Sequence, residues 1–303
     1  MKRNIISAHQ FNKKDIETLL ARAKTFETAY KKNKVPKKLK DKVVACIFFE
    51  PSTRTRLSFE TAALKLGAQV ISAESAMSNS SSYKGESIED TARMLSCYAD
   101  IIVMRHPKEG YAERAASVAS KPIVNAGDGG NEHPSQALLD LYTIKKHLGR
   151  LDNLKVAFGF DPKHSRTIRS LALLLTHFKN NHFTFICPKA LNPDPEFLND
   201  LKNRGANFEI TDNLSEFKNF DIFYANRLQG ERFEDQKEFE KYRKSLIITK
   251  ELVKGTKTLI LDPLPRIDEI EVTVDELPNA IYFDQAQNGL YIRMALLLYA
   301  LGL

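Results

Sequence analysis

The segment richest in reactive side chains is the octapeptide Phe49–Arg56, which reads FEPSTRTR. It follows an apolar run and precedes a helical pattern, so Ser52 and Thr53 should lie where a strand gives way to a helix. The first amides of a helix have no intrahelical partner and attract anions. Arg54 and Arg56 would oppose the helix dipole there unless an anion were bound. The segment therefore predicts an anion site, and a Ser/Thr cap with outward arginines is the plainer alternative.

Three further polar residues need a plainer interpretation beside a functional one, and one of them, Lys84, lies in a serine-rich loop. His133 precedes Pro134 and a helical pattern, and Arg166 begins another such pattern. By itself His133 suits a helix cap or a polar pocket, while Arg166 and Lys84 suit the surface. Because neither GxxxxGKS/T nor GxGxxG follows any apolar run, nucleoside triphosphates and dinucleotides are disfavoured as ligands.

Composition narrows the class of protein. The chain has 303 residues, a net charge of +7 and three cysteines. The basic stretch 31–42 contains no aromatic residue for stacking on bases, which argues against nucleic acid. The cysteines form no CxxC pair, so a disulfide scaffold or a structural zinc site is not expected. With no apolar run of 18 residues and a short apolar start, we expect a soluble, cytoplasmic protein.

Strand-like and helix-like patterns alternate along the chain. Helical spacing is found at 11–33, 57–66 and 135–147. Short apolar runs predict buried strands at 43–49, 100–104, 155–158, 183–187, 221–224, 258–261 and 281–283. This alternation predicts an α/β fold with mostly parallel strands and helices on both faces, divided near residue 150.

At the octapeptide the sequence resembles the carbamoyl-phosphate site of the aspartate and ornithine carbamoyltransferases. The other matching segments follow in the family's order, and the resemblance runs from about residue 5 to residue 302. They are Met104–Pro107, Asn125–Gly129, His133–Gln136, Ser165–Thr167, Arg227–Gln229 and Pro263–Arg266.

The resemblance implies two doubly wound parallel-sheet domains. Residues 1–149 would bind carbamoyl phosphate, residues 150–284 would bind aspartate, and a C-terminal helix at 285–303 would pack back on the first domain. The active site would lie in the cleft between the domains and at a subunit interface. A homotrimer with shared sites is therefore expected, with a separate regulatory chain as an open option and without nucleic acid or membrane as partners.

Two segments favour the aspartate branch of the family. The loop Ser80–Glu86 is similar to the branch in which a lysine reaches a neighbouring subunit's site, and the ornithine branch's Ser-Met-Gly and His-Cys-Leu-Pro segments are absent. Arg227 suits a second carboxylate and would repel an ornithine ammonium. The implied reaction transfers the carbamoyl group of carbamoyl phosphate to L-aspartate in pyrimidine biosynthesis. A different amino-acid acceptor, or a catalytically weak binding or regulatory homologue, are the alternatives.

The resemblance also implies roles for individual residues, and it requires neither a metal nor an organic cofactor. The catalytic residues would be Arg54, Thr55, Lys84, Arg105 and His133. Carbamoyl phosphate would contact Ser52, Thr53, Arg54, Thr55, Ser80, Lys84, Arg105, His133, Gln136, Pro263 and Leu264. Aspartate would contact Lys84, Arg166, Arg227 and Gln229.

Two positions depart from the family pattern. Asp262 stands where the family usually has histidine, and its carboxylate adds negative charge near an anion site unless Arg266 or another cation neutralises it. The role expected of this loop uses the backbone carbonyls of Pro263 and Leu264, so the reaction itself should not depend on residue 262. Phe160 stands where the family more often has glycine, and we expect it to alter the packing of its loop.

Overall fold

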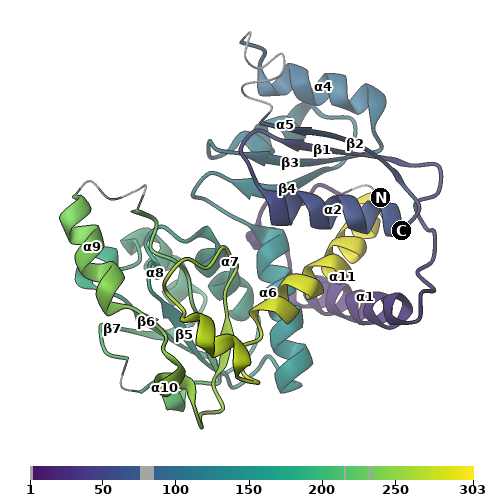
Figure 1. Ribbon diagram of the computed structural model, residues 1–303. Helices are drawn as coiled ribbons and strands as arrows, with labels where there is room; N and C mark the ends of the chain where they lie inside the picture. Colours follow the sequence, from purple (N-terminus) through teal and green to yellow (C-terminus); the bar gives the residue numbers. More distant parts are fainter. Residues whose placement is uncertain (1–2, 76–84, 215, 231–232, 234) are drawn as a thin grey trace. The chain divides into compact units, whose positions relative to one another are not determined.

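The computed structural model describes residues 3–75, 85–214, 216–230, 233 and 235–303 (Figure 1). Its contacts divide the chain into two units. Unit 1 comprises Met1–Tyr142 and Gln287–Leu303, and unit 2 comprises Thr143–Ala286. Both divisions fall inside helices, α6 and α11, and the domain boundaries expected from the sequence stay predictions.

Unit 1 is built on a parallel sheet of four strands. In spatial order these are β2 (Gln69–Glu74), β1 (Val43–Phe48), β3 (Ile101–His106) and β4 (Ile123–Asp128). The helical elements are η1 (Ala8–Gln10), α1 (Lys13–Lys31), α2 (Thr53–Lys65), α4 (Ile88–Tyr98), α5 (Tyr111–Val118), α6 (Pro134–Leu148) and α11 (Tyr282–Leu301). Figure 1 shows α4 and α5 on one side of this sheet and α2 on the other.

Unit 2 is built on a parallel sheet of five strands. In spatial order these are β7 (Asn207–Thr211), β6 (His182–Ile186), β5 (Lys155–Gly159), β8 (Ile222–Tyr224) and β9 (Leu259–Leu261). Its helical elements are α7 (Arg166–Leu175), η3 (Lys189–Leu191), α8 (Pro195–Asn203), η4 (Phe217–Asn219), α9 (Gln236–Ser245), α10 (Lys250–Val253) and η6 (Val272–Glu276).

The predicted α/β class with two doubly wound parallel sheets is confirmed. In each sheet the strand order reverses once, between β1 and β3 in unit 1 and between β5 and β8 in unit 2. At such a point the loops leaving two adjacent strands diverge to opposite faces, and ligands of open α/β sheets bind in the crevice this creates. The fold therefore specifies one candidate ligand edge in each unit.

Sequence patterns missed three strands and misassigned one segment. The edge strands β2 and β7 are mostly exposed and carry no continuous apolar run, and β4 has only Ile123 and Val124 at its apolar start. The run 281–283 was predicted as a strand, and this is wrong, because Tyr282 opens helix α11. A three-residue apolar run does not distinguish a buried strand from the buried start of a helix.

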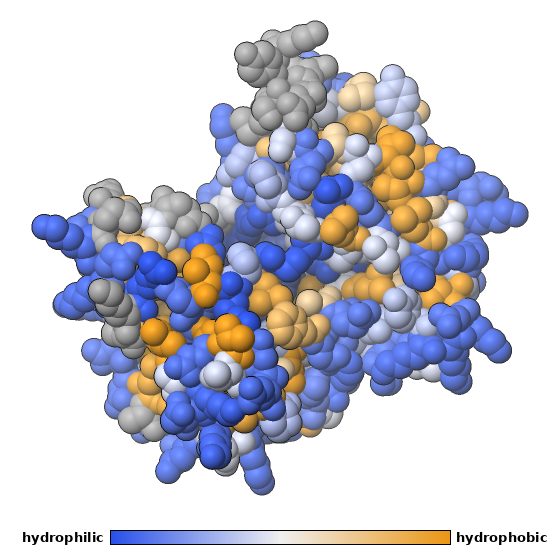
Figure 2. Space-filling model, in the orientation of Figure 1, coloured by the Kyte–Doolittle hydropathy of each residue, from blue (hydrophilic) through white to orange (hydrophobic). Residues whose placement is uncertain are grey.

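The surface carries exposed apolar side chains as well. Large ones include Leu57, Leu64 and Ile71, and Figure 2 shows apolar groups lying among polar ones on the face drawn. Scattered exposure of this kind is ordinary for folded proteins. In the described ranges, the helices that are long enough to cross a membrane are not apolar enough to do so.

Phe160 belongs to the core of unit 2. Its side chain is fully buried, and its ring centroid lies 5.5 Å from that of Phe223. The same apolar cluster includes Phe217, Ile248 and Tyr282. The departure from the family's glycine is thus accommodated by inward packing, which keeps the ring out of the loop that follows β5.

We predict that Phe160→Ala lowers the free energy of unfolding by about 3–5 kcal/mol, because a fully buried ring is lost and a cavity is left. Urea denaturation followed by circular dichroism measures this. Phe283→Ala is the matched control, since that ring is 58% exposed, and it should cost less than about 1 kcal/mol. Equal losses in the two variants would contradict the packing role of Phe160.

Candidate active site

The octapeptide lies at the strand-order reversal of unit 1. Ser52 is the N-cap residue of α2 and Thr53 is its first helical residue. The first turn of α2, which lies wholly within the described residues, contains no acidic side chain. Thr55 is 6% exposed, whereas Arg54 is exposed. The helix amides and the Ser52 and Thr53 hydroxyls therefore form a polar, positive end that an anion would complement.

The two arginines of the octapeptide have different surroundings. The Arg56 guanidinium pairs with Glu60 at 3.0 Å and with Glu74 at 3.1 Å. Glu74 also accepts a long hydrogen bond, 3.4 Å, from the Ser52 amide. Arg56 thus holds the start of α2 against β2, and two carboxylates of unit 1 balance its charge.

Arg105 is the penultimate residue of β3 and is aligned with Phe48 of the neighbouring strand β1. Its Nε lies 2.6 Å from the Glu50 carboxylate, and its side chain is 15% exposed. Burial lowers the pKa of Arg105, and the Glu50 charge opposes that effect. Nη1 lies beside Gly127, where a Cβ would come within 3.3 Å. Glu50 therefore orients the guanidinium through Nε and leaves its Nη edge for an anion.

His133 and Gln136 follow β4 at the start of α6. The His133 carbonyl accepts hydrogen bonds from the amides of Gln136 and Ala137, and its ring Nδ1 lies 3.4 Å from Ser135 Oγ. His133 is 4% exposed and Gln136 is 7% exposed. The Gln136 amide donates through Nε2 to Asp140 Oδ1 at 2.9 Å. Both side chains are held in a nearly dry place, where hydrogen-bond donors act strongly on a developing charge.

In unit 2, Arg166 opens α7, whose N-cap Ser165 accepts a 3.2 Å hydrogen bond from the Ile168 amide. Arg227 and Gln229 follow β8. These three side chains lie on two loops, one after β5 and one after β8, and both loops leave the carboxyl edge of the sheet at the strand-order reversal.

Asp161 connects those loops. It is fully buried and accepts hydrogen bonds from the amides of His164 and Gln229, each at 3.1 Å. The Gln229 side chain in turn donates to the His164 carbonyl at 2.9 Å. Asp161 therefore ties the loop that carries Arg227 to the loop that leads to Arg166.

Asp262 acts on its own loop. Its Oδ1 accepts the Leu264 amide at 2.5 Å, and its amide donates to Gln285 Oε1 at 2.9 Å. Leu264 has φ +58°, a left-handed conformation that needs such support. Arg266 does not hydrogen-bond Asp262 and instead binds Asp275 and the Tyr282 hydroxyl. The Asp262 carboxylate thus serves as an acceptor within the turn.

The structure gathers the expected residues into two groups. The carboxyl edge of the unit 1 sheet carries Ser52, Thr53, Arg54, Thr55, Arg105, His133 and Gln136. The carboxyl edge of the unit 2 sheet carries Arg166, Arg227, Gln229, Pro263 and Leu264. Ser80 and Lys84 lie outside the described residues.

Sequence analysis gave no role to Glu50, Asp140 or Asp161. Glu50 lies within the octapeptide itself, and Asp161 comes two residues after β5. Their positions close to predicted ligand residues could have indicated in the sequence that they have a role at the site. In the described ranges, no cluster of three His, Cys, Asp or Glu side chains could hold a metal ion.

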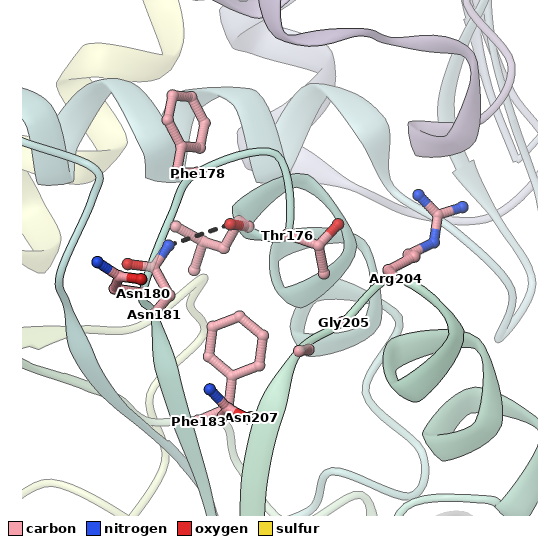
Figure 3. Close-up of a pocket in the computed structure, with 10 residues that line it drawn as sticks. Thr176, Phe178, Asn180, Asn181, Phe183, Arg204, Gly205 and Asn207 are labelled. Atoms are coloured by element: carbon pink, nitrogen blue, oxygen red, sulfur yellow. Dashed lines mark hydrogen bonds between the residues drawn. The ribbon is translucent and has the colours of Figure 1, made fainter.

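A cavity of about 120 Å³ lies at the other end of the unit 2 sheet, where β6 and β7 begin (Figure 3). Its lining includes Asn181, Phe183, Arg204 and Asn207. Asn181 donates to the carbonyls of Leu151 and Leu175 at 3.0 Å. Because no residue of either predicted group lines this cavity, it is separate from the candidate site.

Two family models match the chain. The carbamoyl-phosphate-binding domain of the aspartate/ornithine carbamoyltransferases matches residues 3–146, and the Asp/Orn-binding domain of the same family matches residues 152–300. The chain belongs to the aspartate/ornithine carbamoyltransferase family.

Individual family members are similar over nearly their full length. The aspartate carbamoyltransferase catalytic subunit of Bacteroides fragilis is 47% identical over 305 residues, covering 99% of this chain and 97% of that protein. The catalytic subunit of Methanocaldococcus jannaschii aspartate transcarbamoylase aligns with a TM-score of 0.93 at 44% identity, covering 100% and 98% of the two chains. The Trypanosoma cruzi aspartate transcarbamoylase in complex with N-(phosphonacetyl)-L-aspartic acid aligns with a TM-score of 0.91 at 36% identity, covering 98% and 95%.

We predict that Asp161→Ala destabilises unit 2 by about 3 kcal/mol, because two partly buried amides and the His164 ring lose their hydrogen-bond partner. The same substitution should accelerate hydrogen exchange at the Gln229 amide. Urea denaturation and exchange mass spectrometry measure the two effects. Asp194→Ala is the control, since this carboxylate is 45% exposed and pairs with Arg169, and it should cost less than about 1 kcal/mol. Unchanged exchange at Gln229 in Asp161→Ala would refute the tie between the loops.

Proposed function

We infer that this chain transfers the carbamoyl group of carbamoyl phosphate to the amino group of L-aspartate, giving N-carbamoyl-L-aspartate and phosphate. This is aspartate carbamoyltransferase activity, and we place it in pyrimidine biosynthesis. The observation that carries the inference is the positive start of α2 beside Arg105, in a family member whose full-length relatives bear this name. The Arg227 segment supports a dicarboxylate as the acceptor.

Unit 1 would bind the phosphate. The phosphate would accept hydrogen bonds from the first amides of α2 and from the hydroxyls of Ser52 and Thr53, and Arg54 would add positive charge. Arg105 adds its Nη edge while Glu50 holds its Nε. These donors stabilise the phosphate as it leaves with increasing negative charge.

The carbamoyl group would lie beside the phosphate. Thr55, Arg105 and His133 donate to its carbonyl oxygen, whose negative charge grows as the tetrahedral intermediate forms. Gln136 accepts from the carbamoyl NH2 group, and the backbone carbonyls of Pro263 and Leu264 do the same. The hydrogen bond from the Leu264 amide to Asp262 Oδ1 would hold the turn that carries those two carbonyls.

Arg166, Arg227 and Gln229 would bind the aspartate carboxylates and direct the amine at the carbonyl carbon. The C–N bond forms as the amine attacks, the C–O bond to phosphate breaks, and a phosphate oxygen takes the amine proton. The main contribution to catalysis would come from holding the two substrates in reacting geometry. Such positioning can lower the activation barrier by on the order of 7–11 kcal/mol.

The assembly and location are proposals as well. Ser80 and Lys84 would reach the site of a neighbouring copy, which requires a homotrimer or a multiple of it. A separate regulatory chain and a cytoplasmic location remain predictions from the sequence.

The activity is tested by phosphate release from carbamoyl phosphate, measured with a coupled assay in the presence and absence of L-aspartate. We expect release to depend on L-aspartate and to be far slower with ornithine, because a guanidinium repels an ammonium group. A bisubstrate phosphonoacetyl-aspartate should inhibit more strongly than either half, since it satisfies both charge groups. Equal rates with several amino acids would overturn the choice of acceptor.

Two substitutions separate substrate binding from carbonyl polarisation. Arg227→Ala should raise the KM for aspartate about 10- to 100-fold, because a charged hydrogen-bond pair is lost, with little change for carbamoyl phosphate. His133→Ala should lower kcat about 100-fold with a smaller effect on aspartate binding. Steady-state kinetics measure both, and Arg169→Ala serves as the arginine control in unit 2. An unchanged aspartate KM in Arg227→Ala, or an unchanged kcat in His133→Ala, would refute the respective role.

A further inference from the structure

Glu132 is a buried acidic residue that the proposed mechanism does not use, and it directly precedes His133. It is 5% exposed. Its Oε1 accepts a hydrogen bond from the Ser7 hydroxyl at 2.5 Å, and its Oε2 accepts one from the Ala8 amide. His9 Nε2 lies 4.0 Å from Oε1. Both carboxylate oxygens therefore bind a segment that lies 124 to 125 positions earlier in the sequence.

The N-terminal segment, residues 3–10, lies along the edge strand β4 of unit 1. Ile5 is fully buried and forms a parallel bridge with Val124 of that strand. Its amide donates to a carbonyl of β4 at 2.8 Å, and its carbonyl accepts an amide of β4 at 2.7 Å. The Arg3 amide donates to the Ala300 carbonyl of α11 at 2.9 Å, so the two ends of the chain lie side by side (Figure 1). The segment is thus fixed to both β4 and α11.

The loop from β4 to α6 ends at His133 and is held at several points. The Asp128 amide donates to the Glu132 carbonyl at 3.3 Å, which joins the two ends of the loop. The Gly129 amide donates to the His106 carbonyl at 2.9 Å, which joins the start of the loop to the end of β3. The Glu132 side chain joins the other end of the loop to the N-terminal segment. The backbone position of His133 therefore depends on a contact made by the residue before it.

Small shifts of His133 matter for the role proposed for it. A donor to a developing oxyanion has to lie about 2.7–3.1 Å from the position of that oxygen. Histidine has only two side-chain torsions, so a shift of its backbone is passed on to the ring. A misplacement of about 1 Å can cost as much as about 100-fold in rate. A group that fixes the backbone of His133 therefore affects kcat without touching the substrate.

We propose that Glu132 is a positioning residue that holds His133 against the N-terminal segment, so that the imidazole donates to the carbonyl oxygen of carbamoyl phosphate. The assignment rests on the proposed function and deepens it, because it makes the N-terminal segment part of the support of the site. Inorganic phosphate lacks that carbonyl oxygen, so its binding at the start of α2 does not depend on Glu132.

The first test is Glu132→Ala in the full-length chain. It should lower kcat about tenfold, because a displaced donor loses part of the roughly 100-fold effect expected for removing His133. The KM for aspartate and the inhibition constant of inorganic phosphate should both stay within about twofold of wild type. An unchanged kcat, or a parallel weakening of phosphate binding, would overturn the proposal.

A conservative variant separates hydrogen bonding from charge. In Glu132→Gln the amide oxygen can accept from the Ala8 amide and the NH2 group can donate to Ser7 Oγ, so both contacts are kept. Its kcat should stay within about twofold of wild type, whereas Ser7→Ala removes one contact and should lower kcat about threefold. If Glu132→Ala does not fold, these two variants decide the outcome. A Gln variant that loses about tenfold in kcat, or Ser7→Ala at the full rate, would overturn the proposal.

A double-mutant cycle tests the route through His133. In a His133→Ala background, Glu132→Ala should lower kcat no further, because the group it positions is gone. Additive losses would overturn the proposal.

Glu27→Ala is the matched control in unit 1. Glu27 is 1% exposed and accepts a hydrogen bond from the Tyr142 hydroxyl at 2.6 Å. Its loss should lower the free energy of unfolding and leave kcat unchanged. A tenfold lower kcat in this variant would show that kcat follows stability alone, and would overturn the proposal. Absence of carbamoyl transfer by the wild-type chain would instead refute the function itself.

Discussion

Positive side chains at the positive ends of helices are the constraint on which the rest of the structure depends. Arg54 lies in the first turn of α2 and Arg166 opens α7, although the dipole of each helix disfavours a cation at these places. An anion bound at the same helix start removes the conflict, because it pairs with the cation and with the helix amides together. The two helix starts are therefore the places in the described structure where the proposed anionic substrates would find helix amides and an arginine together.

The carboxylates near these helix starts interact with their neighbours in different ways. Glu60 and Glu74 balance Arg56 fully, whereas Glu50 takes only Nε of Arg105 and leaves the other edge of the guanidinium available. Asp161 orders two loops through the amides of His164 and Gln229 and also contacts the His164 ring. Asp262 is likewise an acceptor in a turn, where its Oδ1 binds the Leu264 amide. Each carboxylate is thus a positioning group, and none is required as a base if phosphate takes the amine proton.

Local chemistry explains why part of the fold and site could be predicted from sequence. The residues of the proposed anion site at α2 are eight consecutive residues, and the helices α1, α2 and α6 carry regular apolar spacing. Of the three strands that sequence analysis missed, β2 and β7 need no apolar run because they lie at sheet edges and much of each is exposed. The run 281–283 was misassigned because burial at a helix start and burial in a strand select the same residue types.

The sequence by itself determined the α/β class and the Ser/Thr/Arg-rich start of α2, because these depend on residues close together in the chain. Only the tertiary structure decided which charges meet. Glu50 binds Arg105, which is 55 positions away in the sequence. Arg266 binds Asp275, while Asp262 accepts a hydrogen bond within its own turn. The Arg293 guanidinium lies over the Phe59 ring, and burial lowers the pKa of Arg293 while the charge of Asp140 opposes that effect. Such pairings follow from strand register and helix packing, which bring distant residues together and exclude water, and no local pattern encodes either.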